Sequence, residues 1–268
     1  MSAQTEIGQL FLMPKDNKHI PHNELSIHNF ADGFSFCTQS KIEFIPHQGL
    51  DHFKNTFKEF FDFYPEGTFE KLSYVTFDTS SSLVPETFWD VDSAIDFAAP
   101  LGEKRADQSI GFDHLKQGGM VNLYYFKKPF TDFLGLQRIP LSQFHYHSRI
   151  FEHVYAYQGD GLPKRLFIHL QKKGFDVFYF DKNALQIHNR FEIKTVDEFL
   201  YYLFFLVEQY ELKPEDFSLF FMGRFAAFEA FYEAVENYHS NILFLPFESA
   251  LNLHLGVHPA PYFATIST

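Results

Sequence analysis

The sequence predicts an α/β protein built from two similar halves, each with the order β-β-β-α-β-α-β. The first observation behind this prediction is a repeated pattern, L-x-I-H-x-x-x-x-G-F, which occurs at residues 25–34 and again at 166–175. The second is that each copy is followed by short apolar runs and then by a segment with helical periodicity. Because order, spacing and hairpin turn coincide in both halves, internal duplication explains the sequence better than chance identities do.

The first half opens with three strands, a helix and a further strand. The dipeptide Asp32-Gly33 between two apolar runs is a strong hairpin signal. Residues 51–64 place five aromatic side chains on one face of a helix. Pro85 suits the first turn of a helix, which we expect to follow an entry turn with capping hydroxyls at 80–82. The expected elements are strands at 25–30, 34–39, 41–46 and 72–77, helices at 51–64 and 85–97, a loop or insertion at 100–118, a strand at 121–126, a short helix at 130–136, a strand at 142–147 and a helix at 149–157.

The second half repeats this order. Thr195, with Glu198 three residues later, has the capping-box signature of a helix start. The helix that follows aligns with the first one, because Asp51 and Phe53 fall on Asp197 and Phe199. The expected elements are strands at 165–170, 175–180 and 184–191, a helix from 195 to about 210, a strand at 217–222, a helix at 225–238 and a strand at 241–245.

A stretch rich in turn-forming residues, QGDGLP, separates the halves and is the clearest linker in the chain. We therefore expect four parts along the sequence. They are an N-terminal extension at 1–24, a first subdomain at 25–157, the linker at 158–163 and a second subdomain at 164–268.

The composition is globular and limits both partners and compartment. The chain has 268 residues, of which 46% are hydrophobic, and its formal net charge is −12. So acidic a surface repels phosphate backbones, which excludes nucleic acid as an expected partner. Cys37 is the only cysteine, and the longest apolar run, at 199–207, is far shorter than the ~20 residues that span a bilayer. These features predict a cytoplasmic protein without membrane insertion.

Three segments carry a resemblance to a known family: SSSLVPETFW at 80–89, LQIHNRFEIKTVDEFLYYLFFLVEQYEL at 185–212 and DFSLFFMGRF at 216–225. The chain resembles an uncharacterised domain-of-unknown-function family of Bacteroidetes-type bacteria from about Leu25 to Leu245. The duplicated order is also similar to the ribonuclease-H-like fold of the actin, sugar-kinase and heat-shock ATPase superfamily. The resemblance implies an actin-like ATPase fold, closest to the pilus- and division-scaffold members, and no assigned activity.

This resemblance also implies a nucleotide cleft with one phosphate-binding hairpin turn in each half and a Gly-Gly pair on the adenosine side. Each phosphate turn of the superfamily has Asp-x-Gly followed by Ser or Thr, and the Asp positions Mg²⁺. In this chain the first phosphate turn, Asp32-Gly33, is not followed by Ser or Thr. The second phosphate turn has Lys172 and Lys173 where a carboxylate would hold the metal. Of the Gly-Gly pair on the adenosine side, only Gly223 is present. The candidate cofactor-binding residues are Asp32, Gly33, Lys172, Lys173, Gly174, Gly223 and Arg224.

These degenerate turns allow two interpretations. In one, Lys172, Lys173 and Arg224 face phosphates directly as a modified anion site. In the other, the lysines form a solvated turn and Gly223 is a helix-entry glycine. The second is favoured, because phosphoryl transfer depends on positioning and charge neutralisation, and a lost metal carboxylate is hard to replace.

A different candidate site is the pair His145 and His147. On a strand, both imidazoles would point to one face, and with His153 or Asp160 they could bind Zn²⁺. The simpler interpretation is an ordinary surface or core pair, since the chain has 14 histidines. The common nucleophile, zinc-protease and nucleotide-binding motifs do not occur, so we expect no catalytic residue.

Three hypotheses for the function follow. The favoured one is a non-catalytic actin-like scaffold that binds a protein partner or itself and shows no Mg-ATPase turnover, with weak binding of ATP or phosphate still allowed. The alternatives are a divergent ATP-binding or ATP-hydrolysing protein and a metal-dependent enzyme that uses His145 and His147. Under the scaffold hypothesis and the ATPase hypothesis, which both assume an actin-like fold, the turns 29–33 and 171–174 should face each other across a groove near Gly223. The 37 phenylalanines are expected to fill the core, with an exposed docking patch on helix 225–238 as the alternative.

Overall fold

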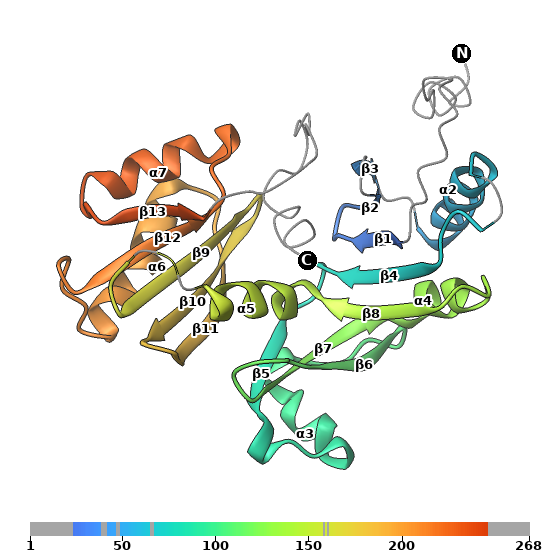
Figure 1. Ribbon diagram of the computed structural model, residues 1–268, viewed down its shortest axis with the longest axis horizontal. Coiled ribbons are helices and arrows are strands. Elements are labelled where there is room, and N and C mark those ends of the chain that lie inside the picture. The colour runs from blue at the N-terminus through green and yellow to red at the C-terminus, as the bar shows by residue number, and fades with distance from the viewer. Residues whose placement is uncertain are drawn as a thin grey trace. The chain divides into compact units, whose positions relative to one another are not determined.

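The computed structural model describes residues 24–38, 42–46, 49–64, 67–157, 159 and 161–245. Apart from Glu24, the expected N-terminal extension therefore lies outside the described residues. The chain divides into two compact units, Met1–Asp78 with Lys127–Gln143 and Thr79–Phe126 with Phe144–Thr268. Each unit is built on one five-stranded sheet (Figure 1). The subdomain boundaries expected around the linker at 158–163 stay a prediction.

The sheet of the first unit has the strand order β3-β2-β1-β4-β8. β1 runs antiparallel to β2 and parallel to β4, which places Ile27 opposite Phe36 and Tyr74. At the hairpin, the Phe30 N–H donates to the Gly33 carbonyl at 2.8 Å, so the predicted Asp-Gly turn is confirmed. The strands are β1 (Glu24–Asn29), β2 (Gly33–Cys37), β3 (Ile42–Pro46), β4 (Lys71–Thr76) and β8 (Leu141–His145).

Two helices, α2 (Leu50–Asp62) and α4 (Lys128–Gly135), bury aromatic side chains against this sheet. Phe53 of α2 lies at the centre of the core, with its ring 5.0 Å from Phe34 and 4.9 Å from Phe130. The apolar stripe that predicted α2 is therefore its packed face. Fully burying one such aromatic side chain contributes about 1.5–3 kcal/mol to folding.

The second sheet, in the second unit, has the order β11-β10-β9-β12-β13. β9 runs antiparallel to β10 and parallel to β12, which places Ile168 opposite Val177 and Phe221. The strands are β9 (Lys164–Gln171), β10 (Gly174–Asp181), β11 (Ala184–Glu192), β12 (Phe217–Met222) and β13 (Ile242–Leu245).

The two sheets repeat the same topology. Ile27 and Ile168 hold matching places in β1 and β9, and their antiparallel partners Phe36 and Val177 are separated by the same 141 residues. Gly33 and Gly174 each begin the second strand. The sequence repeat is thus a repeat of strand order and register, and the predicted duplicated α/β fold is confirmed.

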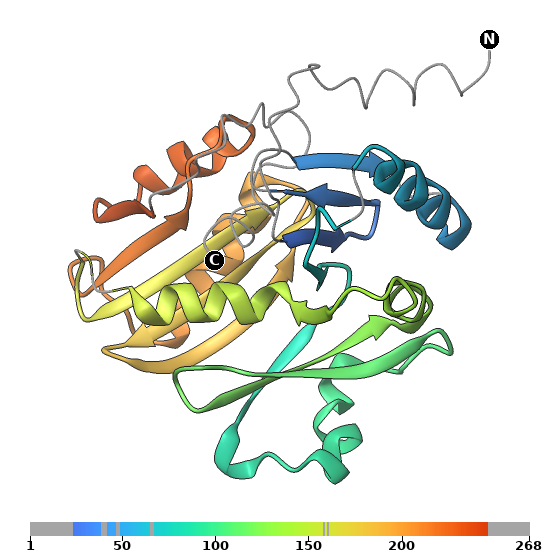
Figure 2. The same cartoon turned by 45° about the vertical axis from the view of Figure 1, so that its right-hand side comes forward.

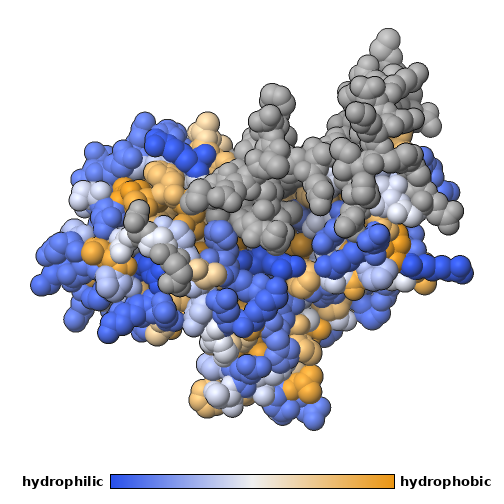
Figure 3. Space-filling model, viewed as in Figure 1, coloured by the Kyte–Doolittle hydropathy of each residue, from blue (hydrophilic) through white to orange (hydrophobic). Residues whose placement is uncertain are grey.

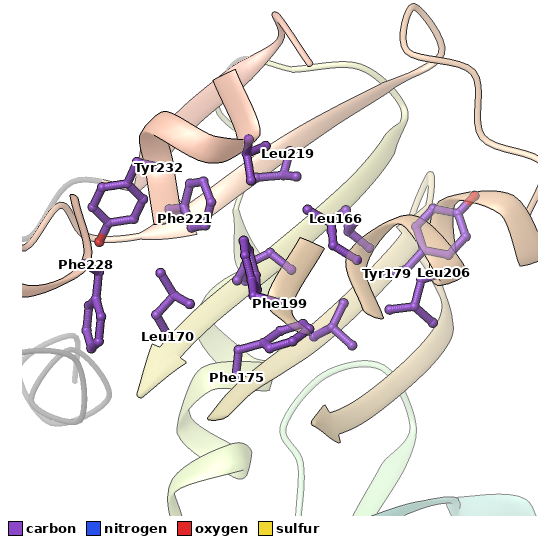
Figure 4. Packing of buried hydrophobic residues seen from close by; sticks show 14 of the residues in the cluster. Leu166, Leu170, Phe175, Tyr179, Phe199, Leu206, Leu219, Phe221, Phe228 and Tyr232 are labelled. Atoms are coloured by element: carbon purple, nitrogen blue, oxygen red, sulfur yellow. The ribbon is translucent and has the colours of Figure 1, made fainter. Parts of the chain in front are cut away.

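Helices α6 (Val196–Gln209) and α7 (Glu229–Glu236) cover one face of the second sheet. Thr195 caps α6 as predicted, because its hydroxyl accepts the Glu198 N–H at 3.1 Å. Figure 4 shows Phe199 of α6 pointing into a cluster with Phe175 and Phe221. The buried cluster also includes Phe228 and Tyr232, with Phe231 packed against it, whereas Tyr238 at the end of the predicted helix 225–238 is exposed.

The opposite face of the second sheet is covered by α5 (Tyr146–Ala156), which lies across β9 and β10 in Figure 2. The sequence predicted a strand through His147 and a helix from Arg149, and the structure corrects both boundaries. β8 ends at His145, and α5 starts at Tyr146 because the His145 side chain accepts the His147 N–H and caps the helix.

An inserted segment joins β4 to α4. It contains the strands β5 (Ser81–Pro85), β6 (Gln108–His114) and β7 (Met120–Lys127), which form a sheet of order β5-β7-β6. Short 3₁₀ turns and the helix α3 (Ala94–Phe97) lie between β5 and β6 in the sequence. The predicted helix at 85–97 and loop at 100–118 are therefore largely wrong, and Ser81 and Ser82 lie in a strand. Pairing with β7, forty residues away, decides the conformation of β5.

Candidate functional site

The first predicted phosphate turn connects β1 and β2 in the first unit. Asp32 is half-buried at its tip, and Gly33 is buried. A Cβ at Gly33 would lie 2.4 Å from the carbonyl oxygen of Ile45 on β3. The close approach of a neighbouring strand therefore requires glycine here, whether or not a phosphate binds.

The second predicted turn, Lys172-Lys173 between β9 and β10, is constructed in the same way. A Cβ at Gly174 would lie 2.4 Å from the carbonyl oxygen of Phe191 on β11. The Lys173 carbonyl accepts the N–H of Ile193 at 3.1 Å, which ties the turn to the end of β11. Strand packing thus accounts for the repeated glycine in both halves.

Lys173 also lines a surface pocket of about 690 Å³ at the start of α6. The carboxyl-bearing residues Glu192, Asp197 and Glu198 line the same pocket. Lys194 lines it too, so an anion that enters the pocket would meet three carboxylates and two lysines. This environment makes Lys173 a poor dedicated phosphate ligand.

At the turn predicted for the adenosine side, Gly223 follows β12 with φ 76°, and a Cβ there would lie 2.7 Å from the ring of Phe225. The Tyr232 hydroxyl accepts the Phe225 N–H at 3.3 Å and donates to the Gly223 carbonyl at 3.5 Å. Arg224 is paired with Glu229. The polar groups of this turn are thus engaged within the protein.

The topology brings some of these residues to one place. Because β9 and β12 are parallel neighbours, the turns at 172–173 and 223–224 lie at the same edge of the second sheet. Asp32 and Gly33 belong to the first unit. The expected meeting of all three turns across a groove stays a prediction.

His145 is a structural cap. Its Nδ1 accepts the His147 N–H at 3.2 Å, so its Nε2 carries the proton and donates to the carbonyl of Thr79 at 3.0 Å. Both ring nitrogens are therefore occupied, and burial lowers the pKa of His145 well below its ordinary value. Within the described residues, no group of three or more His, Cys, Asp or Glu side chains could hold a metal ion. Asp160, one of the suggested additional ligands, lies outside the described residues.

A buried carboxylate that the sequence analysis did not identify lies nearby. Asp176, on β10, accepts hydrogen bonds from the Tyr146 hydroxyl at 2.9 Å, from His169 Nδ1 at 2.9 Å and from Gln171 Nε2 at 2.7 Å. Arg190 Nη1 lies 3.3 Å from the same carboxylate. Side chains from α5, β9, β10 and β11 thus meet on one carboxylate.

The charges of this network follow from burial and pairing. Burial opposes ionisation of Asp176, but the interactions with His147 and Arg190 and the donated hydrogen bonds hold the pKa of Asp176 well below its ordinary value. Burial lowers the pKa of His147 and of His188. These imidazoles are therefore neutral at neutral pH, and Arg190 supplies the positive charge that balances Asp176.

A pocket of about 560 Å³ opens beside the network, between β5 and β11. Within it, Ser81 Oγ lies 2.7 Å from His147 Nδ1, and His147 Nε2 lies 3.0 Å from Asp176 Oδ1. A hydroxyl, a neutral imidazole and a carboxylate in this order also occur in nucleophilic enzymes. Here the carboxylate is shared with four further side chains, Tyr146, His169, Gln171 and Arg190, which hold it and the His147 ring in place beside the pocket.

Comparison with solved structures gives the class of fold. A Bacteroides thetaiotaomicron protein described as having an actin-like ATPase fold and unknown function matches with a TM-score of 0.68 and 18% identity, over 87% of this chain and 94% of that one. The PilM–PilN type IV pilus biogenesis complex matches with a TM-score of 0.58 and 10% identity, over 92% and 97%. The protein has an actin-like ATPase fold.

Residues 14–242 match the family described as "Protein of unknown function (DUF3822)", and the chain belongs to this family. The resemblance noted in the sequence is thereby confirmed. A search of curated proteins gave no match. In the part of the chain that the structure describes, every helix is too short or too polar to cross a membrane.

Proposed function

We propose that this protein is a non-catalytic scaffold, a pseudo-ATPase that uses the actin-like fold to bind a protein partner or a second copy of itself. One observation carries the proposal: the second phosphate turn presents Lys172 and Lys173 where the superfamily places a metal-binding carboxylate. Unit charges of like sign about 4 Å apart repel by on the order of 1–4 kcal/mol, depending on exposure. The turn therefore disfavours Mg²⁺ and still tolerates an anion.

The remaining candidate residues support this proposal. Gly33 and Gly174 are required by strand packing, and the Gly223 turn is filled by Phe225 and closed by Tyr232. Arg224 is already paired with a carboxylate. Weak binding of ATP or phosphate is compatible with these turns, whereas ordered binding of a metal–nucleotide pair is not.

Association with protein is supported by exposed apolar surface. Four exposed large hydrophobic side chains lie in the inserted segment, namely Phe88, Val91, Ile95 and Phe112. Figure 3 shows hydrophobic residues on the part of the surface that this segment forms. The PilM–PilN structure, which shares the fold, is itself a complex of two proteins. A cytoplasmic location belongs to the same proposal, supported by the single buried, unpaired Cys37.

A thermal-shift titration of the full-length protein separates this function from its alternatives. We expect ATP alone and ATP with Mg²⁺ to raise the melting temperature by the same small amount, because the metal adds no contact. A further rise with Mg²⁺ would favour the divergent ATPase. Metal analysis of the purified protein tests the third hypothesis, in which stoichiometric zinc would point to an enzyme based on His145 and His147.

A further inference from the structure

We propose that the pocket between β5 and β11 binds an extended peptide that carries an acidic side chain and pairs with the free edges of both strands. This inference rests on the proposed scaffold function and names the chemistry of the partner. It is based on the observation that two edge strands from different sheets line one pocket of about 560 Å³.

The first free edge belongs to β5. Among the described residues β5 pairs with β7 alone, at the end of the order β5-β7-β6. The Glu86 N–H donates to the Gly119 carbonyl at 2.8 Å, and antiparallel ladders alternate between bonded and open residues. Ser81 and Leu83 therefore turn their N–H and C=O groups away from β7. Pro85, at the next outward position, has no N–H, as suits an edge strand.

The second edge belongs to β11, which has no neighbour but β10 among the strands that the structure describes and ends the order β11-β10-β9-β12-β13. The Ile193 N–H donates to the Lys173 carbonyl, so the same alternation turns the backbone of Arg190 and His188 outward. The Arg190 N–H is satisfied by Asn189 Oδ1 at 2.8 Å. Within residues 161–245, no hydrogen bond of the His188 backbone is found on this outward side, so these groups can pair with a strand that enters the pocket.

The residues of the lining favour an anionic side chain over a cationic one. None of the fifteen lining residues is Asp or Glu, although the protein has 34 acidic residues, and Arg190 is the one Lys or Arg among them. The contacts of Arg190 with Tyr146 and Asp176 both use Nη1, and its side chain is 24% exposed. Its other N–H groups can therefore bind a carboxylate from the pocket.

The dimensions and the remaining walls suit a short peptide. The volume falls within the range of about 300–1,000 Å³ that is usual for ligand pockets. Leu101, Met120 and Ile187 supply apolar surface. Successive side chains of an extended strand point to opposite faces. A peptide in which acidic and apolar residues alternate can therefore place the acidic ones near Arg190 and the apolar ones against Leu101, Met120 and Ile187.

Selection of peptides on the intact protein tests this inference. Phage-displayed random nonapeptides are panned on the full-length chain, and the best sequence is synthesised with a fluorescein label and titrated by fluorescence anisotropy. The test variant is Leu83→Pro, which removes an outward N–H, and the matched control is Leu83→Ala, which keeps it. We expect Leu83→Ala to bind within about twofold of the wild type and Leu83→Pro at least about tenfold more weakly.

N-methylation of successive peptide bonds gives a second readout that does not depend on how Leu83→Pro folds. A strand that lies between two edges directs its successive N–H groups alternately to β5 and to β11, so pairing with both edges predicts that methylation of any peptide bond within the paired segment weakens binding and that methylation at the peptide's ends is tolerated. Failure to enrich any sequence, equal binding by Leu83→Pro, uniform tolerance of N-methylation, or full competition by free glutamate would each overturn the inference. None of these results bears on the response to Mg–ATP, so the scaffold proposal is tested separately.

Discussion

Replacing Gly174 with alanine tests whether the repeated glycines are there for strand packing. The new Cβ would lie 2.4 Å from the carbonyl oxygen of Phe191, and real Cβ atoms essentially never approach closer than 3.0 Å. The β10–β11 pair must therefore open by roughly 0.6 Å. Overpacking of this kind costs about 1–3 kcal/mol. For a chain of this size, the loss lowers the melting temperature by about 2–12 °C.

The assay is thermal unfolding followed by circular dichroism, with and without ATP. Gly135→Ala is the matched control, because that glycine is helical and a Cβ there has no neighbour within 4 Å. We expect Gly135→Ala to be neutral or slightly stabilising. A Gly174→Ala protein that melts with the wild type would refute the packing explanation and return Gly174 to the list of candidate phosphate contacts.

Two further predictions concern stability. His28 is buried with a pKa lowered by burial to about 3, so the unfolded chain binds more protons below its ordinary pKa of about 6.5. His28 therefore makes stability fall by about 1.4 kcal/mol per pH unit as the pH drops from about 6.5 to 3, and urea unfolding across this range should show a flatter profile for His28→Gln. Thr195→Ala removes the cap of α6 and should cost about 1 kcal/mol in the same assay; an unchanged midpoint would contradict the capping role.

The repeated elements of the fold were predictable because their signals are local. The Asp32-Gly33 turn and the apolar runs on either side define a hairpin without reference to the rest of the chain. Thr195 and Glu198 similarly define the start of α6. The register shared by Ile27 and Ile168 then follows from the repeat itself.

The inserted sheet was missed because its signals are not local. Pro85 suggested a helix start, yet it ends a strand whose partner is β7, and the intervening residues 86–107 contain only short turns and α3. In such a segment long-range pairing outweighs weak propensity.

The network around Asp176 was missed for a related reason. Its donors come from α5, β9 and β11, and their sequence separation hides the cluster. One signal was available. Asp176 interrupts the apolar run of β10, and a charged residue within a buried strand needs partners.

Steady-state ATP turnover by the full-length protein in the presence of Mg²⁺ tests the central claim most directly. The two lysines of the second turn and the engaged Gly223 turn predict no phosphate release above the buffer background. The Asp32→Ala variant is the control, because Asp32 is the one carboxylate that the two phosphate turns offer. Turnover in the wild type that disappears in Asp32→Ala would contradict the account and show that the protein is a divergent ATPase.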